Sequence, residues 1–545
     1  MTRRSPSRTE QAQPQKGIDS GESPPASGKL TMVSGLLAVC GLALLVRLLL
    51  LLTLVEFPGI ADPNHYYNLA VRLTEGHGFS IDYLWHYGDP PARLVHPIDH
   101  WMPLTGSMAA GGMQVFGRGV RSALALFVLA GSMLPIIAFW MAQRLKLTRA
   151  GALFSAAVVA FLPELMVYSL RTDTVVPFSL LVGLTILLFQ RGLGSRSNWA
   201  FAAAGFCAGL AYLCRHDAVL LMPALAGTAF FAWRQRGGDS RWPLTGLSLA
   251  LGTGLLVAFP WLLRNLTVLG RLGPAEIPQM FFFTDHLDHY AYGQAFTPGS
   301  MLAKQTVGQL LGKRVFELLA AAKVMIEALG SFLVVSLAGG ALLVLRDRDQ
   351  MRATKLLPVA VLLLAALIAY PLLLPYKSQA GSFKKLFVAS LPLLVPLAAF
   401  ALERAILDRR IRQGAMVLVA TLLLVVGADR VRTEAGDNQA YLDLIEPRAR
   451  TAAAQPDTNG DGRIVLMVED PFIFRYFGLQ SVMYPSGSRE AILEVAERYA
   501  VDYLLMPSHR PELAAIERGL EQDPRFLHWT LIPGTAACLY RIDPE

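Results

Sequence analysis

About eleven long apolar runs constrain this chain more than any other feature of its sequence. Each approaches the roughly 20 residues that an α-helix needs to cross a bilayer. The runs lie near residues 31–55, 120–143, 150–169, 174–190, 198–213, 217–233, 243–263, 325–345, 356–376, 386–403 and 412–428. Hydrophobic residues make up 53% of the chain and charged residues only 17%, which is far more apolar than a soluble enzyme of this length. The sequence therefore predicts a mainly α-helical, multi-pass membrane protein.

Basic residues gather in five of the connections between these runs. The clusters lie at 144–149, 191–196, 234–241, 346–355 and 404–412. Under the positive-inside rule all five would face the cytoplasm. With the N-terminus inside and an odd number of spans, the C-terminal region would lie outside. This pattern accounts for the net charge of +8 and argues against a nucleic-acid partner.

Composition divides the chain into three parts. Residues 1–30 are rich in Ser, Pro, Gln, Gly and charge, which predicts a disordered cytoplasmic tail. Residues 31–429 predict the membrane domain, with large outer loops at 56–119 and 265–324. From 430 to 545 charges become frequent and apolar runs shorten, which predicts a soluble α/β domain on the outer face. Strands are expected in it at 463–468, 501–506 and 537–541, and helices at 489–499 and 511–520.

The first outer loop carries the most informative polar residue, Asp62, close to the end of the first span. An ionisable group at a membrane boundary is costly unless it is solvated, paired or used, so Asp62 is a candidate site residue. The alternative is a helix N-cap or simple loop solvation, because Asp before a helical segment caps well. Tyr66, in the same stretch, could stack on a substrate or belong to an interfacial aromatic belt.

Two short turns would place further charges on the outer side. In the first, Asp173 could orient an acceptor, hold Arg171 or help to bind a divalent cation, although a cap for the following helix fits nearly as well. In the second, Arg215-His216-Asp217 could contact substrate or form an interfacial charged turn. Both turns therefore remain candidates for substrate binding.

Lys384 and Lys385 open an apolar run on the outer side, against the positive-inside trend. A lipid phosphate resting there would be held by charge and by the free N–H groups of a helix start. Anchoring to lipid headgroups is the alternative. Arg171 could add a third cation to such a phosphate site.

Histidines recur in both large outer loops. His96 and His100, with Asp99 between them, could supply metal ligands, and hydrogen bonds to substrate or to the loop backbone are the more ordinary outcome. The segment 285–290, Asp-His-Leu-Asp-His-Tyr, raises the same possibility. Neither segment alone establishes a metal site, so a divalent metal stays open and no other cofactor is expected.

Several of these motifs together resemble the GT-C superfamily of integral-membrane glycosyltransferases, of the protein-mannosyltransferase and lipid A aminoarabinose-transferase type. The resemblance rests on Asp62-Pro-Asn-His-Tyr-Tyr-Asn-Leu-Ala70, Gly76-His-Gly78, His96-Pro97, the Arg171-Thr-Asp173 turn and the α/β tail. It covers almost the whole chain after residue 30. Such enzymes use an acidic residue in the first outer loop, which matches Asp62, but Pro63 stands where the family usually has a second acidic residue.

The resemblance implies transfer of a sugar from a polyprenyl-phosphate donor to a lipid, glycan or protein acceptor on the outer face of a bacterial inner membrane. Asp62 would then be the base that takes the acceptor proton. Asp173 would be a second catalytic carboxylate, and Lys384, Lys385 and Arg171 would bind the donor phosphate. The alternatives are an oligosaccharyl or O-antigen type transferase and a non-enzymatic polyprenyl-lipid flippase.

Overall fold

The computed structural model describes residues 26–238, 241–346, 350–374, 376, 379–506, 512–533 and 537–543. Eight helices within these residues are long and apolar enough to cross a membrane, or up to nine if one bent helix pair counts as a span. The eight segments are Met32–Leu54, Val120–Arg144, Val175–Ser195, His216–Gln235, Trp242–Leu269, Thr354–Leu373, Gly381–Ala405 and Arg409–Ala453. The chain is therefore a mostly helical, multi-pass membrane protein.

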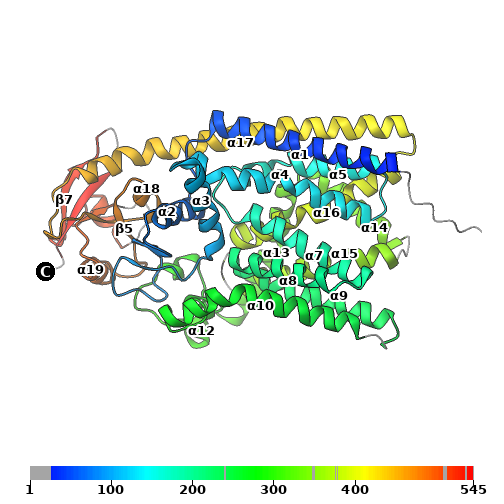
Figure 1. Ribbon diagram of the computed structural model, residues 1–545. Helices are drawn as coiled ribbons and strands as arrows, with labels where there is room; N and C mark the ends of the chain where they lie inside the picture. The colour runs from blue at the N-terminus through cyan, green and yellow to red at the C-terminus, as the bar shows by residue number, and fades with distance from the viewer. Residues whose placement is uncertain are drawn as a thin grey trace, which may run out of the picture.

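The helical bundle occupies one end of the molecule and a β-sheet the other (Figure 1). Its helices are α1 (Ala26–Leu54), α4 (Val120–Arg144), α5 (Arg149–Phe161), α6 (Pro163–Tyr168), α7 (Val175–Ser195), α8 (Asn198–Cys214), η1 (His216–Leu220), α9 (Leu221–Gln235), α10 (Trp242–Leu269), α13 (Val307–Leu329), α14 (Ser331–Arg346), α15 (Gln350–Leu367), η3 (Ile368–Leu373), η4 (Gln379–Phe383), α16 (Lys384–Ala405) and α17 (Arg409–Ala453).

The expected number of about eleven spans is larger than the eight or nine helices that are long and apolar enough to cross a membrane. Pro163 divides one predicted run into α5 and α6, because proline lacks the N–H that would continue the helix. At 17 residues, α8 is also shorter than the roughly 20 needed to span. In α13 and α14, the chain bends by 105° within another run. Each predicted apolar run contains helix, but composition did not predict the helix bounds: α13 begins at Val307, inside the segment 265–324 that was expected to be an outer loop.

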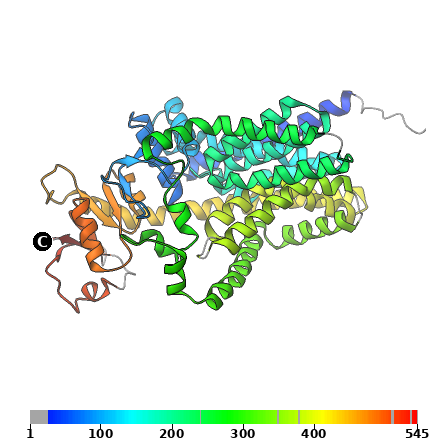
Figure 2. The same ribbon diagram turned by 90° about the horizontal axis from the view of Figure 1, so that it is seen from below.

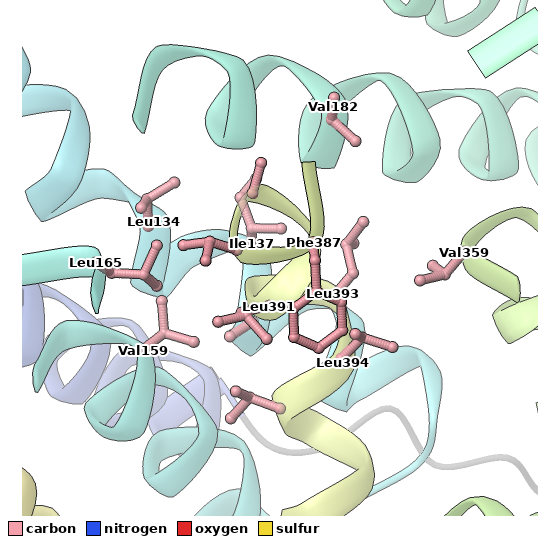
Figure 3. Packing of buried hydrophobic residues seen from close by; sticks show 14 of the residues in the cluster. Leu134, Ile137, Val159, Leu165, Val182, Val359, Phe387, Leu391, Leu393 and Leu394 are labelled. Atoms are coloured by element: carbon pink, nitrogen blue, oxygen red, sulfur yellow. The ribbon is translucent and has the colours of Figure 1, made fainter. Parts of the chain in front are cut away.

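The α16 helix lies at the centre of the bundle. Its side chains from Leu386 to Phe400 are all buried, as expected for a helix that is apolar on every side. Figure 3 shows Phe387 and Leu391 of α16 among side chains of α4, α5 and α7. The first residues of this helix, Lys384 and Lys385, are therefore fixed in place by the core that follows them.

The α17 helix connects the bundle to the sheet. It is continuous over 45 residues, or about 68 Å at 1.5 Å per residue, roughly twice the hydrocarbon thickness of a bilayer. Figure 1 shows it running beside α1 and on towards the strands. The change in composition at residue 430 thus falls inside a helix, and the polar half of α17 carries the chain out of the apolar layer.

The two long polar loops fold against the same end of the bundle. The first forms α2 (Asp62–Thr74), β1 (Ser80–Ile81), β2 (Tyr83–Leu84), β3 (His96–Pro97) and α3 (Pro103–Phe116), with β1 antiparallel to β3. The second forms α11 (Glu276–Met280), η2 (His286–Tyr290) and α12 (Pro298–Lys304) before α13 begins. Figure 2 shows this second loop projecting from the bundle beside the C-terminal strands.

The C-terminal region is a six-stranded mixed sheet in the order β2-β5-β4-β6-β8-β7. Its own elements are β4 (Val465–Val468), α18 (Pro471–Tyr476), β5 (Gln480–Met483), α19 (Arg489–Arg498), β6 (Tyr503–Leu505), α20 (Ala514–Glu517), β7 (Phe526–Leu531) and β8 (Cys538–Ile542). The strands expected at 463–468, 501–506 and 537–541 correspond to β4, β6 and β8. One edge strand, β2, comes from the first outer loop and pairs in parallel with β5, so the sheet includes a strand that lies far away in the sequence.

A buried charge triad joins this loop to the C-terminal region. Asp82 pairs with Arg72 of α2 at 2.8 Å and with Arg475 of α18 at 2.7 Å. The Arg72 and Asp82 side chains are below 10% exposed and that of Arg475 is 17% exposed. Asp82 is therefore an anion that two nearly buried guanidinium groups share.

The Asp82→Asn variant is expected to lower the free energy of unfolding by about 3–5 kcal/mol, because it leaves two buried arginines without their counter-charge. Thermal unfolding of the purified protein in detergent would measure the loss. Asp443→Asn, at an exposed site on α17, is the matched control and should change little. Equal melting temperatures for the two variants would contradict the role of the triad.

Candidate functional site

Asp62 is the first residue of α2, not its N-cap. The N-cap position belongs to Ala61, which makes no side-chain capping bond. Ala61 adopts φ 61°, a conformation that costs a non-glycine residue of order 1–3 kcal/mol and often marks a functional site. The carboxylate of Asp62 is thus not used for capping, so it is available to another partner.

The turn at 171–173 is fastened to the start of the first outer loop. The Thr172 N–H donates to the Pro58 carbonyl at 3.3 Å, and its hydroxyl donates to the Pro63 carbonyl. These bonds bring Asp173, which is 1% exposed, next to Asp62. The backbone of two distant segments therefore sets the position of both carboxylates.

The two oxygens of Asp173 have different partners. Oδ1 accepts hydrogen bonds from the Thr174 hydroxyl at 3.1 Å and the Val175 N–H at 3.2 Å. Oδ2 accepts from the Lys385 ammonium at 2.7 Å. The two interpretations of Asp173 from the sequence, a helix cap and a site carboxylate, are both consistent with this geometry.

Lys385 lies between the two carboxylates. Its Nζ donates to Asp62 Oδ2 at 2.9 Å and to Asp173 Oδ2 at 2.7 Å. The Lys385 and Asp173 side chains are 13% and 2% exposed, while that of Asp62 is 37% exposed. Asp62 is therefore the carboxylate of this cluster that solvent, or a substrate, can reach.

The electrostatics of the cluster keep Asp62 ionised. The exclusion of water around it would raise the pKa of Asp62, but the Lys385 charge and hydrogen bond, together with Arg215, outweigh this and hold the pKa below its ordinary value. Arg215 joins the cluster through a 2.9 Å hydrogen bond from Nη1 to the Thr174 hydroxyl and also pairs with Asp217. Three charged segments thus meet at one place.

The other two predicted phosphate ligands have carboxylate partners of their own. Lys384 Nζ lies 3.3 Å from Glu164 Oε1 of α6. Arg171 forms an ion pair with Glu434 of α17. Among the described residues neither forms an ion pair with Asp62 or Asp173, so their ion-pair partners differ from those of Lys385.

The remaining predicted substrate ligands lie in several surroundings. Tyr66 is buried, and its burial, followed by the Asp62 charge, raises its pKa well above the ordinary range. His96 Nδ1 bonds the Leu94 carbonyl at 2.7 Å, the ordinary outcome considered for it. His216 follows Arg215 and lies against the Tyr212 ring. His100 belongs to a second cluster.

This second cluster brings the two histidine-containing loops together around Glu276. His86, His100 and Glu276 place ligand atoms within 4.8 Å of one another, and His289 Nδ1 also meets Glu276. Burial would raise the pKa of Glu276, but His86 and the other imidazoles hold it well below its ordinary range. Glu276 and His86 were missed from the sequence, because a single Glu in a loop and a His between Trp85 and Tyr87 carry no local signal.

Comparison with known proteins agrees with this architecture. Residues 95–263 match the family model of dolichyl-phosphate-mannose-protein mannosyltransferases. A structure of ArnT from Cupriavidus metallidurans bound to undecaprenyl phosphate aligns with a TM-score of 0.57 over 95% of this chain and 98% of that one, at 13% identity. The chain therefore shares the fold of ArnT, and residues 95–263 resemble a family of membrane mannosyltransferases.

Two structures of a second GT-C protein, the Archaeoglobus fulgidus oligosaccharyltransferase AglB, share the fold. The complex with an inhibitory peptide and a dolichol-phosphate aligns with a TM-score of 0.56 at 13% identity, over 88% of this chain and 70% of that one. The complex with Zn and sulfate gives 0.55 at 14% identity, over 86% and 67%. A comparison with curated protein sequences finds no match. The resemblance to GT-C enzymes seen in the sequence is thus confirmed.

Proposed function

We propose that this GT-C protein transfers a sugar from a polyprenyl-phosphate donor to a lipid, glycan or protein acceptor. The observation that carries the proposal is the position of Lys385 between Asp62 and Asp173. This arrangement places a carboxylate that can accept a proton, Asp62, beside a cation that can bind phosphate, Lys385. Both lie at the end of the bundle where the polar loops fold.

In the proposed reaction the acceptor hydroxyl or amine attacks the anomeric carbon of the donor. A new bond forms between these atoms while the bond from the anomeric carbon to the phosphate oxygen breaks. Asp62 takes the acceptor proton, and polyprenyl phosphate leaves with the bonding electrons. Lys385 stabilises the negative charge that develops on the leaving phosphate.

The donor would also activate Asp62. While Lys385 contacts both carboxylates, Asp62 is a weak base because its charge is neutralised. A donor phosphate competes for the same ammonium group and draws it away from Asp62. The pKa of Asp62 then rises, and the carboxylate becomes a better proton acceptor only when donor is bound. Asp173, capping α7 with its other oxygen, holds the lysine in place.

The phosphate ligands in this proposal are Lys385 and Arg215. Arg215 is linked to the cluster through Thr174 and can supply a planar guanidinium to a phosphate. Lys384 and Arg171 leave the proposal, because their ion pairs are with Glu164 and Glu434 and not with Asp62 or Asp173. Tyr66, His216 and Asp217 remain proposed contacts for the sugar or the acceptor.

The solved relatives support a polyprenyl-linked donor. ArnT was solved with undecaprenyl phosphate and AglB with a dolichol-phosphate. An oligosaccharyl-type transferase is the second candidate. The alignment favours the first, since it covers 98% of the ArnT chain but leaves about a third of AglB without a counterpart here.

We also propose an orientation for the site. Under the positive-inside rule the five basic clusters favour a cytoplasmic position for the end of the bundle opposite the polar loops. The polar loops, the end of α17 and the sheet then lie on the outer face of a bacterial inner membrane. The α/β region, joined to the first loop through β2, would cover the acceptor side of the site as an extracytoplasmic domain.

The proposal is tested by sugar transfer in isolated membranes, supplied with a panel of radiolabelled polyprenyl-phosphate sugars. Label is expected to reach an acceptor from one donor class with the wild type and not with Asp62→Asn. Transfer only from lipid-linked oligosaccharides would favour the second candidate. No transfer from any donor, with a folded protein, would favour the flippase alternative.

A further inference from the structure

Glu276 is the buried centre of a histidine cluster built from two distant loops. Its side chain is 0% exposed. His86 and His100 approach from the first outer loop, and His289 approaches from η2 in the second. A buried carboxylate needs compensation from charge or hydrogen bonds, because its desolvation costs several kcal/mol.

Three polar atoms of this cluster have no hydrogen-bond partner. His86 Nδ1, His100 Nδ1 and Glu276 Oε2 are buried and have no hydrogen-bond partner. These same atoms face one another, with Glu276 Oε2 2.9 Å from His100 Nδ1 and 3.5 Å from His86 Nδ1. Two imidazole nitrogens and a carboxylate oxygen that converge in this way are suited to bind a divalent cation.

The surrounding groups orient these atoms as ligands. Asp99 Oδ1 lies 3.8 Å from His86 Nε2, which favours a proton on Nε2 and leaves Nδ1 free to bind a metal. Asp99 is held in turn by Arg271 at 3.3 Å. His289 Nδ1 contacts Glu276 Oε1, so Oε2 is the oxygen that remains. Partners of this kind fix the tautomer and the direction of metal ligands.

We propose that His86, His100 and Glu276 bind a divalent transition metal of the Zn²⁺ class. Two imidazoles and one carboxylate are borderline ligands that suit Zn²⁺ better than Mg²⁺ or Ca²⁺, which prefer oxygen alone. A water completes the coordination. The site goes beyond the proposed transfer reaction, since neither Asp62 nor Lys385 takes part in it.

The metal would hold the two outer loops against each other beside the catalytic cluster. Trp85 packs on both His86 and His100, with ring centroids 4.5 and 4.8 Å apart, and on Trp101 at 4.4 Å. Trp101 in turn stacks on His65 of α2 at 3.9 Å. A contiguous set of rings thus connects the proposed metal to the helix that begins at Asp62.

The test is the metal content of the full-length protein purified in detergent, measured by inductively coupled plasma mass spectrometry after dialysis with Zn²⁺. We expect about one zinc per chain for the wild type, and a large loss for Glu276→Gln and for His100→Gln. His286→Gln is the matched control, an exposed histidine in the same η2 segment, and should retain the metal.

A second readout does not depend on a variant that folds. A strong chelator should lower the melting temperature of the wild type, and added Zn²⁺ should restore it, because a ligand that binds only the native state stabilises it. Wild-type protein that binds no zinc and shows no shift with chelator would overturn the proposal. Metal content is independent of sugar transfer, so a failure here is distinguishable from a failure of the proposed function.

Discussion

Asp62→Asn is expected to lower the rate of sugar transfer by about 10²–10⁴-fold, the range that a positioned general base contributes. Asparagine keeps the shape of the side chain and can still accept a hydrogen bond from Lys385 at its amide oxygen, but it cannot take a proton from the acceptor. Because the Asp62 side chain is 37% exposed, the substitution should leave the fold intact. The measurement is the initial rate of transfer with saturating donor.

The matched control is Glu56→Gln, which removes a more exposed carboxylate, at 73%, from the same loop. It should transfer at the wild-type rate. Both variants should still bind the donor, because Lys385 and Arg215 are unchanged. Donor binding is measured as the rise in melting temperature when donor is added. A wild-type transfer rate for Asp62→Asn would show that another group is the base.

Lys385→Met is expected to have the largest effect on both stability and activity. It removes the cation that joins Asp62 to the buried Asp173, and the loss of one partner from a buried ion pair costs about 3–5 kcal/mol. It also removes the proposed ligand of the leaving phosphate. Thermal unfolding and transfer rates in the same detergent would measure the two losses. The double variant with Asp173→Asn should recover part of the stability and none of the activity.

Lys385→Met should also change the dependence on pH. In the wild type the pKa of Asp62 is below its ordinary value, so its contribution to stability is present above the ordinary pKa and is lost as the pH falls through the lowered one. Without Lys385 the pKa rises, and the acid limb of any residual activity moves to higher pH. Lys384→Met, which affects only the pair with Glu164, should leave that limb in place. An unchanged limb in Lys385→Met would contradict the pairing.

Two adjacent lysines show which features of the site the sequence could predict and which it could not. Lys384 and Lys385 have the same chemistry and are consecutive residues at the start of the apolar run, so both were predicted to bind phosphate. Adjacent residues on a helix point about 100° apart, and only the packing of α16 decides which one faces the carboxylates. Lys385 reaches Asp62 and Asp173, whereas Lys384 reaches Glu164.

The sequence by itself determined the membrane class, the apolar helices of the bundle and three of the six strands of the C-terminal sheet, and it singled out Asp62, Asp173 and Lys385 as candidate site residues. These are local properties, because the free energy of an apolar run or of a charge at a membrane boundary depends on nearby residues. Only the tertiary structure decided that Lys385 joins two carboxylates, that β2 completes the sheet and that Glu276 gathers histidines from two loops. Those pairings join segments up to about 400 residues apart, and their free energy comes from contacts that no local pattern encodes.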